Sequence, residues 1–180
     1  MRAHVVYESM FGNGHAVADA VAQGIRAADP SADVTVVSVL EVSDAPDTDL
    51  LVVGGPTHML TLSRPETRAS RAQKLDAEED RRRAEREPGA DTGRGVREWL
   101  EQVAPADGVP AAAFDTRVDR PVPKRAAAGI AKRLRHAGYR VVLPPEGFHV
   151  LGTSGPLADG ELERAAAWGS QVARVVAVPA

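Results

Sequence analysis

The sequence predicts an α/β protein built on a doubly wound parallel sheet. Short apolar runs alternate along the chain with amphipathic helical stretches, which is the pattern of a parallel sheet covered by helices on both faces. The length of 180 residues suits a single domain, residues 1–180, with one core. A turn of small residues between the first strand and the first helix is a third indication, because folds of this class bind ligands at such turns.

Five strands are expected, near residues 3–8, 33–39, 49–55, 110–115 and 139–143. Each is a short and mostly apolar run, as expected of strands that are buried on both faces. Helices are expected at about 13–28, 95–104, 124–137 and 159–176. Apolar residues recur along one side of each helix; in the second they are Val96, Trp99, Leu100 and Val103.

One segment, from about residue 64 to residue 94, departs from this alternation. It is dominated by Arg, Glu, Asp and Ala, and it has almost no large apolar residue after Leu75. Mixed charge at this density is typical of a solvated helix or a mobile excursion. We therefore expect a charged insertion after the third strand, and the alternative is a lid or a partner-docking arm beside the site.

Composition excludes several classes of function. The chain has no cysteine, so disulfides, thiolate metal sites and cysteine nucleophiles are ruled out. No apolar run approaches the roughly 20 residues of a membrane span, and no signal peptide is expected, so we expect a cytoplasmic protein without a membrane partner. The net charge is −3 and basic residues are interleaved with acids, which gives no support for nucleic-acid binding.

The candidate site lies where the strands end. In doubly wound sheets, ligands bind outside the carboxyl ends of the strands, where the strand order reverses, which selects residues 8–15, 55–63 and 115–122. The first of these loops leads into a helix. Backbone N–H groups at a helix N-terminus lack intrahelical partners and carry the positive end of the helix dipole, so this turn suits a phosphate.

Other phosphate-binding and catalytic motifs do not match. Gly12-Asn13-Gly14 lacks the third glycine of the dinucleotide fingerprint, because Val17 stands there, and no Gly-Lys pair of a Walker loop occurs. A receiver domain needs an aspartate at the end of strand three, where residues 53–58 read Val-Gly-Gly-Pro-Thr-His. Ser9 is not in a nucleophile elbow, which requires Gly-x-Ser-x-Gly. The three histidines near strand ends lack ligand spacing, so no metal site is predicted.

The sequence resembles the flavodoxin-like family in three segments. Residues 5–14, Val-Val-Tyr-Glu-Ser-Met-Phe-Gly-Asn-Gly, resemble the flavodoxin phosphate loop, and residues 49–58, Asp-Leu-Leu-Val-Val-Gly-Gly-Pro-Thr-His, resemble that family's third strand and second flavin loop. Residues 155–164 are similar to the start of its last helix. The resemblance implies a five-stranded parallel sheet of order 2-1-3-4-5 and flavin mononucleotide (FMN) as the cofactor.

The resemblance also implies which residues hold FMN. The residues implied for the 5′-phosphate are Ser9, Met10, Phe11, Gly12, Asn13 and Gly14. Those implied for the edge of the isoalloxazine ring are Pro56, Thr57, His58 and Met59, with Asp115, Thr116 and Arg117 opposite them. Phe11 and Gly14 occupy positions where the family has hydroxyl groups, and each lost contact costs about 1 kcal/mol.

The second and third loops contain no Trp or Tyr to cover the flavin. With His58 and Arg117 nearby and no strongly acidic rim, the reduced anionic flavin is expected to be less destabilised than in a typical flavodoxin. His58 is a candidate to hydrogen-bond the flavin or to protonate a reduced quinone, and His15 is a candidate phosphate neighbour. For both, the alternative is a solvent-facing side chain. For His149, a structural role is favoured.

Three functions follow from the sequence. The first is an FMN-binding redox protein that transfers electrons between a reductase and an acceptor. The second is an FMN-dependent NAD(P)H:quinone oxidoreductase, and the third is a flavin-free flavodoxin-like binding module, which Phe11 and Gly14 keep open. The expected partner is accordingly a redox protein or a quinone-like small molecule. No catalytic residue is assigned.

Overall fold

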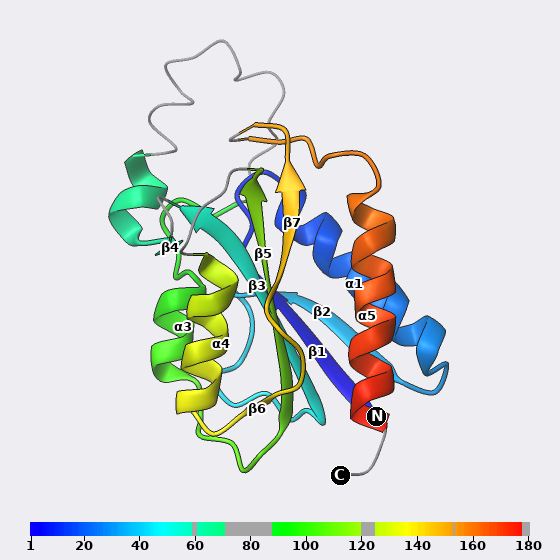
Figure 1. Cartoon of the computed structure of the whole chain (residues 1–180). Helices are drawn as coiled ribbons and strands as arrows, with labels where there is room; N and C mark the ends of the chain where they lie inside the picture. Colours follow the sequence, from blue (N-terminus) through cyan, green and yellow to red (C-terminus); the bar gives the residue numbers. More distant parts are fainter. Residues whose placement is uncertain (59–60, 71–87, 120–124, 153, 178–180) are drawn as a thin grey trace.

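The computed structural model describes residues 1–58, 61–70, 88–119, 125–152 and 154–177, and its centre is a twisted, mainly parallel sheet (Figure 1). The sheet has the order β2-β1-β3-β5-β6. Its strands are β1 (Arg2–Tyr7), β2 (Asp33–Ser38), β3 (Leu50–His58), β5 (Pro110–Val118) and β6 (Arg140–Val141). Strand β7 (Glu146–Val150) also pairs with β5, and the short β4 (Thr61–Leu62) pairs antiparallel with the end of β3.

The predicted fold class is confirmed. Every pairing among β1, β2, β3, β5, β6 and β7 is parallel, and the order matches 2-1-3-4-5 when the five predicted strands are numbered along the chain. The predicted helices correspond to α1 (Asn13–Ala28), α3 (Val96–Gln102), α4 (Ala126–His136) and α5 (Glu161–Ala177).

The fifth strand differs from the prediction of a single strand at 139–143. It is divided into β6 and β7, and the longer piece, β7, lies beyond the predicted range. Pro144 and Pro145 stand between the two pieces. The register with β5 ends at Val141 and resumes at Glu146, and the two prolines in this gap have no N–H to donate to a β-ladder.

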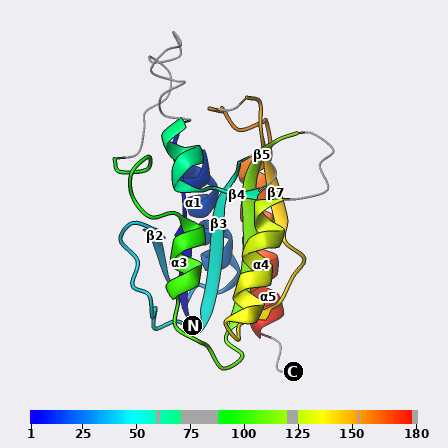
Figure 2. The same ribbon diagram turned by 90° about the vertical axis from the view of Figure 1, so that its left-hand side faces the viewer.

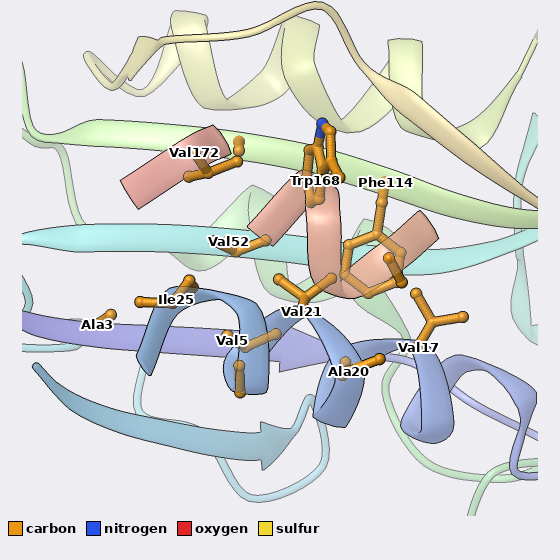
Figure 3. Packing of buried hydrophobic residues seen from close by; sticks show 14 of the residues in the cluster. Ala3, Val5, Val17, Ala20, Val21, Ile25, Val52, Phe114, Trp168 and Val172 are labelled. Atoms are coloured by element: carbon orange, nitrogen blue, oxygen red, sulfur yellow. The ribbon is translucent and has the colours of Figure 1, made fainter. Parts of the chain in front are cut away.

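Helices cover both faces of the sheet (Figures 1 and 2). Helices α1 and α5 lie on one face, and α3 and α4 lie on the other, each pair over its own apolar cluster. On the first face Trp168 of α5 packs edge-on against Phe114, at 6.2 Å between ring centroids, beside Val17 and Val21 of α1 (Figure 3). On the second face Trp99 is fully buried and donates to the Ser43 carbonyl.

Helices α1 and α5 cross at two glycines. A Cβ atom on Gly24 would lie 1.9 Å from the Ala166 carbonyl oxygen, and one on Gly169 would lie 2.2 Å from that of Val21. Ser170 Oγ donates to the Gly24 carbonyl at 2.8 Å across the same contact. This crossing packs the backbone of α1 directly against that of α5, two turns or more from the N-terminus of α1.

The expected charged insertion is described only at its ends. Residues 65–70 are helical, whereas residues 71–87 lie outside the described part. The described ends are anchored: Arg68 is 2% exposed, and Arg94 Nε donates to the Val39 carbonyl at 2.9 Å. Among the described helices, none is long and apolar enough to cross a membrane.

Candidate functional site

The three loops selected from the sequence adjoin one another at the carboxyl edge of the sheet. Tyr7 at the end of β1 pairs with Gly54 of β3, and Pro56 of β3 pairs with Thr116 of β5. Strand β1 lies between β2 and β3, so the chain departs to opposite sides after β1 and after β3. This is the topological switch point at which doubly wound sheets bind ligands.

The phosphate loop combines a helix N-terminus with small residues. Gly12 precedes α1 with φ of 79°, and no side chain caps the helix. Ser9 is 5% exposed, and its Oγ has no hydrogen-bond partner in the described part of the chain. A buried hydroxyl without a partner costs about 1–3 kcal/mol, and an oxygen of a bound phosphate would satisfy it.

Gly14 sits where α1 approaches the preceding strand. A Cβ atom there would lie 2.6 Å from the carbonyl oxygen of Glu8 and 3.2 Å from Ser9 Cβ. The absence of the family's hydroxyl at this position thus has a steric cause in this chain. The loop is closed too tightly for a side chain, and main-chain N–H groups must do more of the binding.

The amide of Asn13, expected at the phosphate, points elsewhere. Its Nδ2 donates to the Ser154 carbonyl at 3.1 Å. Gly155, at φ of 102°, packs so closely that a Cβ atom would lie 2.5 Å from Asn13 Nδ2. The segment after β7 therefore forms a further wall of the phosphate loop, which the sequence analysis missed. Gly155, at the start of the segment 155–164 that resembles the family's last helix, was a local sign of it.

On the ring side, Asp115 and Thr57 support α4. Asp115 is fully buried, and its Oδ2 accepts from Thr57 Oγ1 at 3.0 Å and from the Ala127 N–H at 2.9 Å. Thr57 Oγ1 in turn accepts from the Ala126 N–H at 2.9 Å. Two of the residues expected to face the flavin thus direct their side chains to the first turn of α4 and hold that turn at the ends of β3 and β5.

Arg117 lies beside Asp115 on β5. Its Nη1 donates to Asp115 Oδ1 at 2.7 Å, and its side chain is 9% exposed. The guanidinium occupies the space above Gly147 of β7, where a Cβ atom would lie 1.2 Å from Nη1. The carboxylate neutralises much of the Arg117 charge, so a direct electrostatic effect of Arg117 on a flavin is weaker than the sequence suggests.

The histidines have separate surroundings. The His15 ring stacks on Tyr7 at 4.5 Å between centroids, and its Nε2 lies 3.6 Å from Asp19. His149 Nε2 lies 3.7 Å from Asp119. The side chain of His58 and the whole of Met59 lie outside the described part, so their expected roles stay predictions. Among described residues, no group of three His, Asp or Glu side chains could hold a metal.

A buried polar cluster adjoins the phosphate loop, and the sequence analysis missed it. We call Glu8, Ser63, Arg68 and Glu98 the Glu8 cluster. Ser63 Oγ donates to Glu8 Oε1, the Val96 N–H donates to Glu8 Oε2 at 2.8 Å, and Arg68 Nη1 donates to Ser63 Oγ at 3.1 Å. Burial raises the pKa of Glu8, and the hydrogen bonds from Ser63 and Val96 partly oppose this.

The fold and the loop define the class of protein: a doubly wound α/β protein with a candidate phosphate-binding loop at its switch point. Comparison with protein families finds that residues 5–89 match the flavodoxin model. Comparison with curated protein sequences found no match.

Solved structures of flavodoxins and a WrbA-like protein share the fold of this chain. A flavodoxin from the domain Archaea is 23% identical, with a TM-score of 0.63 over 98% of this chain and 99% of that one. Oxidised flavodoxin 1 from Bacillus cereus is 15% identical, with a TM-score of 0.66 over 97% and 98% of the two chains. The WrbA-like flavodoxin protein of Agrobacterium tumefaciens is 19% identical, with a TM-score of 0.55 over 97% and 96%.

The chain therefore has the flavodoxin-like fold, as residues 5–14 and 49–58 predict, its residues 5–89 match the flavodoxin family, and FMN is the cofactor of that family. The phosphate end of the site fits FMN, because the unpartnered Ser9 hydroxyl and the uncapped N-terminus of α1 are groups that a phosphate dianion would bind. A bound flavin would supply one- and two-electron redox chemistry.

Proposed function

We propose that this protein binds FMN and transfers electrons between a reductase and an acceptor. The observation that carries the proposal is the buried Ser9 hydroxyl, which has no partner among described residues and lies beside the N-terminus of α1. The loop is at the switch point, and Gly12 leaves open space beside its backbone, where a Cβ atom would meet nothing within 4 Å. The family match over residues 5–89 supports FMN in preference to another phosphate ligand.

The environment of the proposed ring site favours a moderate potential. In the described parts of the second and third loops there is no Trp or Tyr, and Asp115 is paired with Arg117. The net charge of −3 gives no strongly acidic field to oppose a second electron. We therefore expect the semiquinone/hydroquinone couple to be less negative than in flavodoxins with a stacked aromatic residue and an acidic rim.

FMN binding is tested first. The purified chain, freed of flavin, is titrated with FMN while flavin fluorescence and absorbance are followed. Binding with a distinct change in the flavin spectrum is expected, and Ser9→Ala should weaken it about fivefold, since one hydrogen bond contributes about 1 kcal/mol. A chain that leaves the fluorescence of added FMN unchanged would be a flavin-free module, and the proposal would fail.

Electron transfer is then separated from enzymatic quinone reduction. The loaded protein is reduced by a flavoprotein reductase, and its reoxidation by an acceptor protein is followed. Rapid steady oxidation of NADH or NADPH with a quinone, without any reductase, would replace the carrier proposal by the quinone oxidoreductase. A loaded protein that a reductase cannot reduce would contradict both roles.

A further inference from the structure

The Glu8 cluster joins two parts of the candidate site that are far apart in the sequence. Glu8 follows β1 directly and is the residue before Ser9, whereas Ser63 follows β4 directly. The Ser63 hydroxyl donates to the Glu8 carboxylate, and both residues are buried, at 0% and 6% exposed. This bond connects the base of the phosphate loop to the base of the hairpin that closes the second loop.

Backbone contacts link Glu8 to β3 and to the first turn of α1. The Glu8 N–H donates to the Gly54 carbonyl at 2.9 Å, and Gly14 in the first turn of α1 packs against the Glu8 carbonyl. A displacement of Glu8 would therefore move the start of the phosphate loop and the first turn of α1 together.

The hairpin on the other side is held as firmly. Thr57 and His58 of β3 pair with Leu62 and Thr61 of β4. Arg97 Nε donates to the Ser63 carbonyl at 3.0 Å, and its Nη2 donates to the Leu62 carbonyl at 2.9 Å. Arg97 thus holds the end of β4 at Ser63, and with it the β3–β4 pairing beside the expected ring site.

Arg68 completes the connection and brings one positive charge to the carboxylates of Glu8 and Glu98. It is 2% exposed, donates to Ser63 Oγ at 3.1 Å and to the Gly93 carbonyl at 2.9 Å, and pairs with Glu98 at 3.0 Å. Glu98 also accepts the Gly95 N–H at 2.7 Å. Two carboxylates and one guanidinium thus meet where Glu8, Ser63 and Arg68 are buried and Glu98 is partly exposed, and each bond has a defined direction.

We propose that Glu8, Ser63 and Arg68 are positioning residues that couple the phosphate subsite to the ring subsite of FMN. This inference rests on the proposed binding of FMN. A rigid connection between two subsites lets the phosphate, once bound, hold the ring at a high effective concentration in its own subsite. Loosening the connection lowers the affinity for the whole cofactor and leaves the affinity for each part unchanged.

Three ligands test the coupling: FMN, riboflavin, which lacks the phosphate, and inorganic phosphate. Their dissociation constants are measured for the wild-type chain and for Ser63→Ala, which removes the hydroxyl that bridges Glu8 and Arg68. The expected result is a rise of about tenfold or more in the dissociation constant for FMN, while those for riboflavin and phosphate stay within about twofold.

A matched control is Ser170→Ala. Ser170 also makes an interhelical hydrogen bond, part-buried and 2.8 Å long, to the Gly24 carbonyl, but between α1 and α5. It should lower thermal stability and leave all three affinities unchanged. Glu8→Gln, which keeps the side-chain shape, gives a second measurement that remains informative if Ser63→Ala does not fold.

The outcomes separate the two proposals. A wild-type chain that fails to bind FMN refutes the proposed function. A wild-type chain that binds FMN, with Ser63→Ala and Glu8→Gln either binding FMN unchanged or losing all three ligands in parallel, refutes the coupling and leaves FMN binding intact.

Discussion

Introducing a hydroxyl at position 14 should weaken FMN binding, although the flavodoxin pattern places a hydroxyl there. A Cβ atom on Gly14 would lie 2.6 Å from the Glu8 carbonyl oxygen, and Cβ atoms essentially never come within 3.0 Å of another heavy atom. The backbone of α1 and the end of β1 must separate by at least the difference, 0.4 Å. Overpacking of this kind costs about 1–3 kcal/mol.

The new hydroxyl of Gly14→Thr would recover about 1 kcal/mol if it reached the phosphate. Because the strain is larger than this gain and displaces the N–H groups that bind the phosphate, the dissociation constant should rise about 5- to 30-fold, corresponding to 1–2 kcal/mol. Fluorescence titration with FMN measures the change, and thermal unfolding without FMN measures the strain.

Two variants isolate the cause. Gly14→Ala has the same Cβ atom without the hydroxyl and should lose at least as much affinity as Gly14→Thr. Phe11→Thr adds a hydroxyl at a half-buried position and should tighten binding about fivefold, since one hydrogen bond contributes about 1 kcal/mol. Tighter binding by Gly14→Thr than by the wild-type chain would show that the steric reasoning is wrong.

Three further predictions concern stability, pH and potential. Gly24→Ala should destabilise the fold by about 3 kcal/mol and lower Tm by about 6–12 °C, because the new Cβ would meet backbone atoms. The control Gly129→Ala, whose new Cβ would have its nearest atom at 3.5 Å, should leave Tm unchanged. Equal Tm values for the two variants would contradict the steric argument. Burial raises the pKa of Glu161, but hydrogen bonds from Arg164 and from a backbone N–H outweigh it, so the net pKa lies below the ordinary 4.5. The ionised Glu161 therefore stabilises the folded state above pH 4.5, and this contribution is lost as pH falls through the lower pKa of the folded state. Glu161→Gln should accordingly lower the free energy of unfolding by about 1 kcal/mol at pH 7 and by little at pH 3, measured by urea unfolding. The control Glu163→Gln, at an exposed position, should have the stability of the wild type at both pH values. A loss of stability in Glu161→Gln that is the same at pH 7 and pH 3 would argue against a role for the charge. Finally, spectroelectrochemistry should give a semiquinone/hydroquinone couple above that of acidic flavodoxins, and a very negative couple would refute the argument from net charge.

Much of the fold was predictable because its signals are local. The 13–28 helix was predicted with the observed bounds, since apolar spacing and the following Asp29-Pro30 are read directly from the sequence. The divided fifth strand was missed although Pro144 and Pro145 were visible. The apolar residues at 139–143 were taken as the strand itself, whereas the longer pairing forms beyond the prolines.

The candidate site was predictable in its location and only partly in its contacts. The turn at residues 8–14 identifies a helix N-terminus at the switch point, and that inference needs no tertiary information. The hydrogen bonds of Asp115 to α4 and of Asn13 to Ser154 join residues 12 and 141 positions apart in the sequence, and no local pattern specifies such partners.

The sequence by itself determined the order of strands and helices, the small-residue turn and the family resemblance, because periodicity and motif spacing are properties of neighbouring residues. Only the tertiary structure decided that Gly14 cannot carry a side chain, that Arg117 is neutralised by Asp115, and that Glu8 meets Ser63 and Arg68 in a buried cluster. These three contacts depend on the distances between strands and helices that the whole chain packs together. Differences of a few tenths of an ångström in those distances decide which groups remain to bind a ligand.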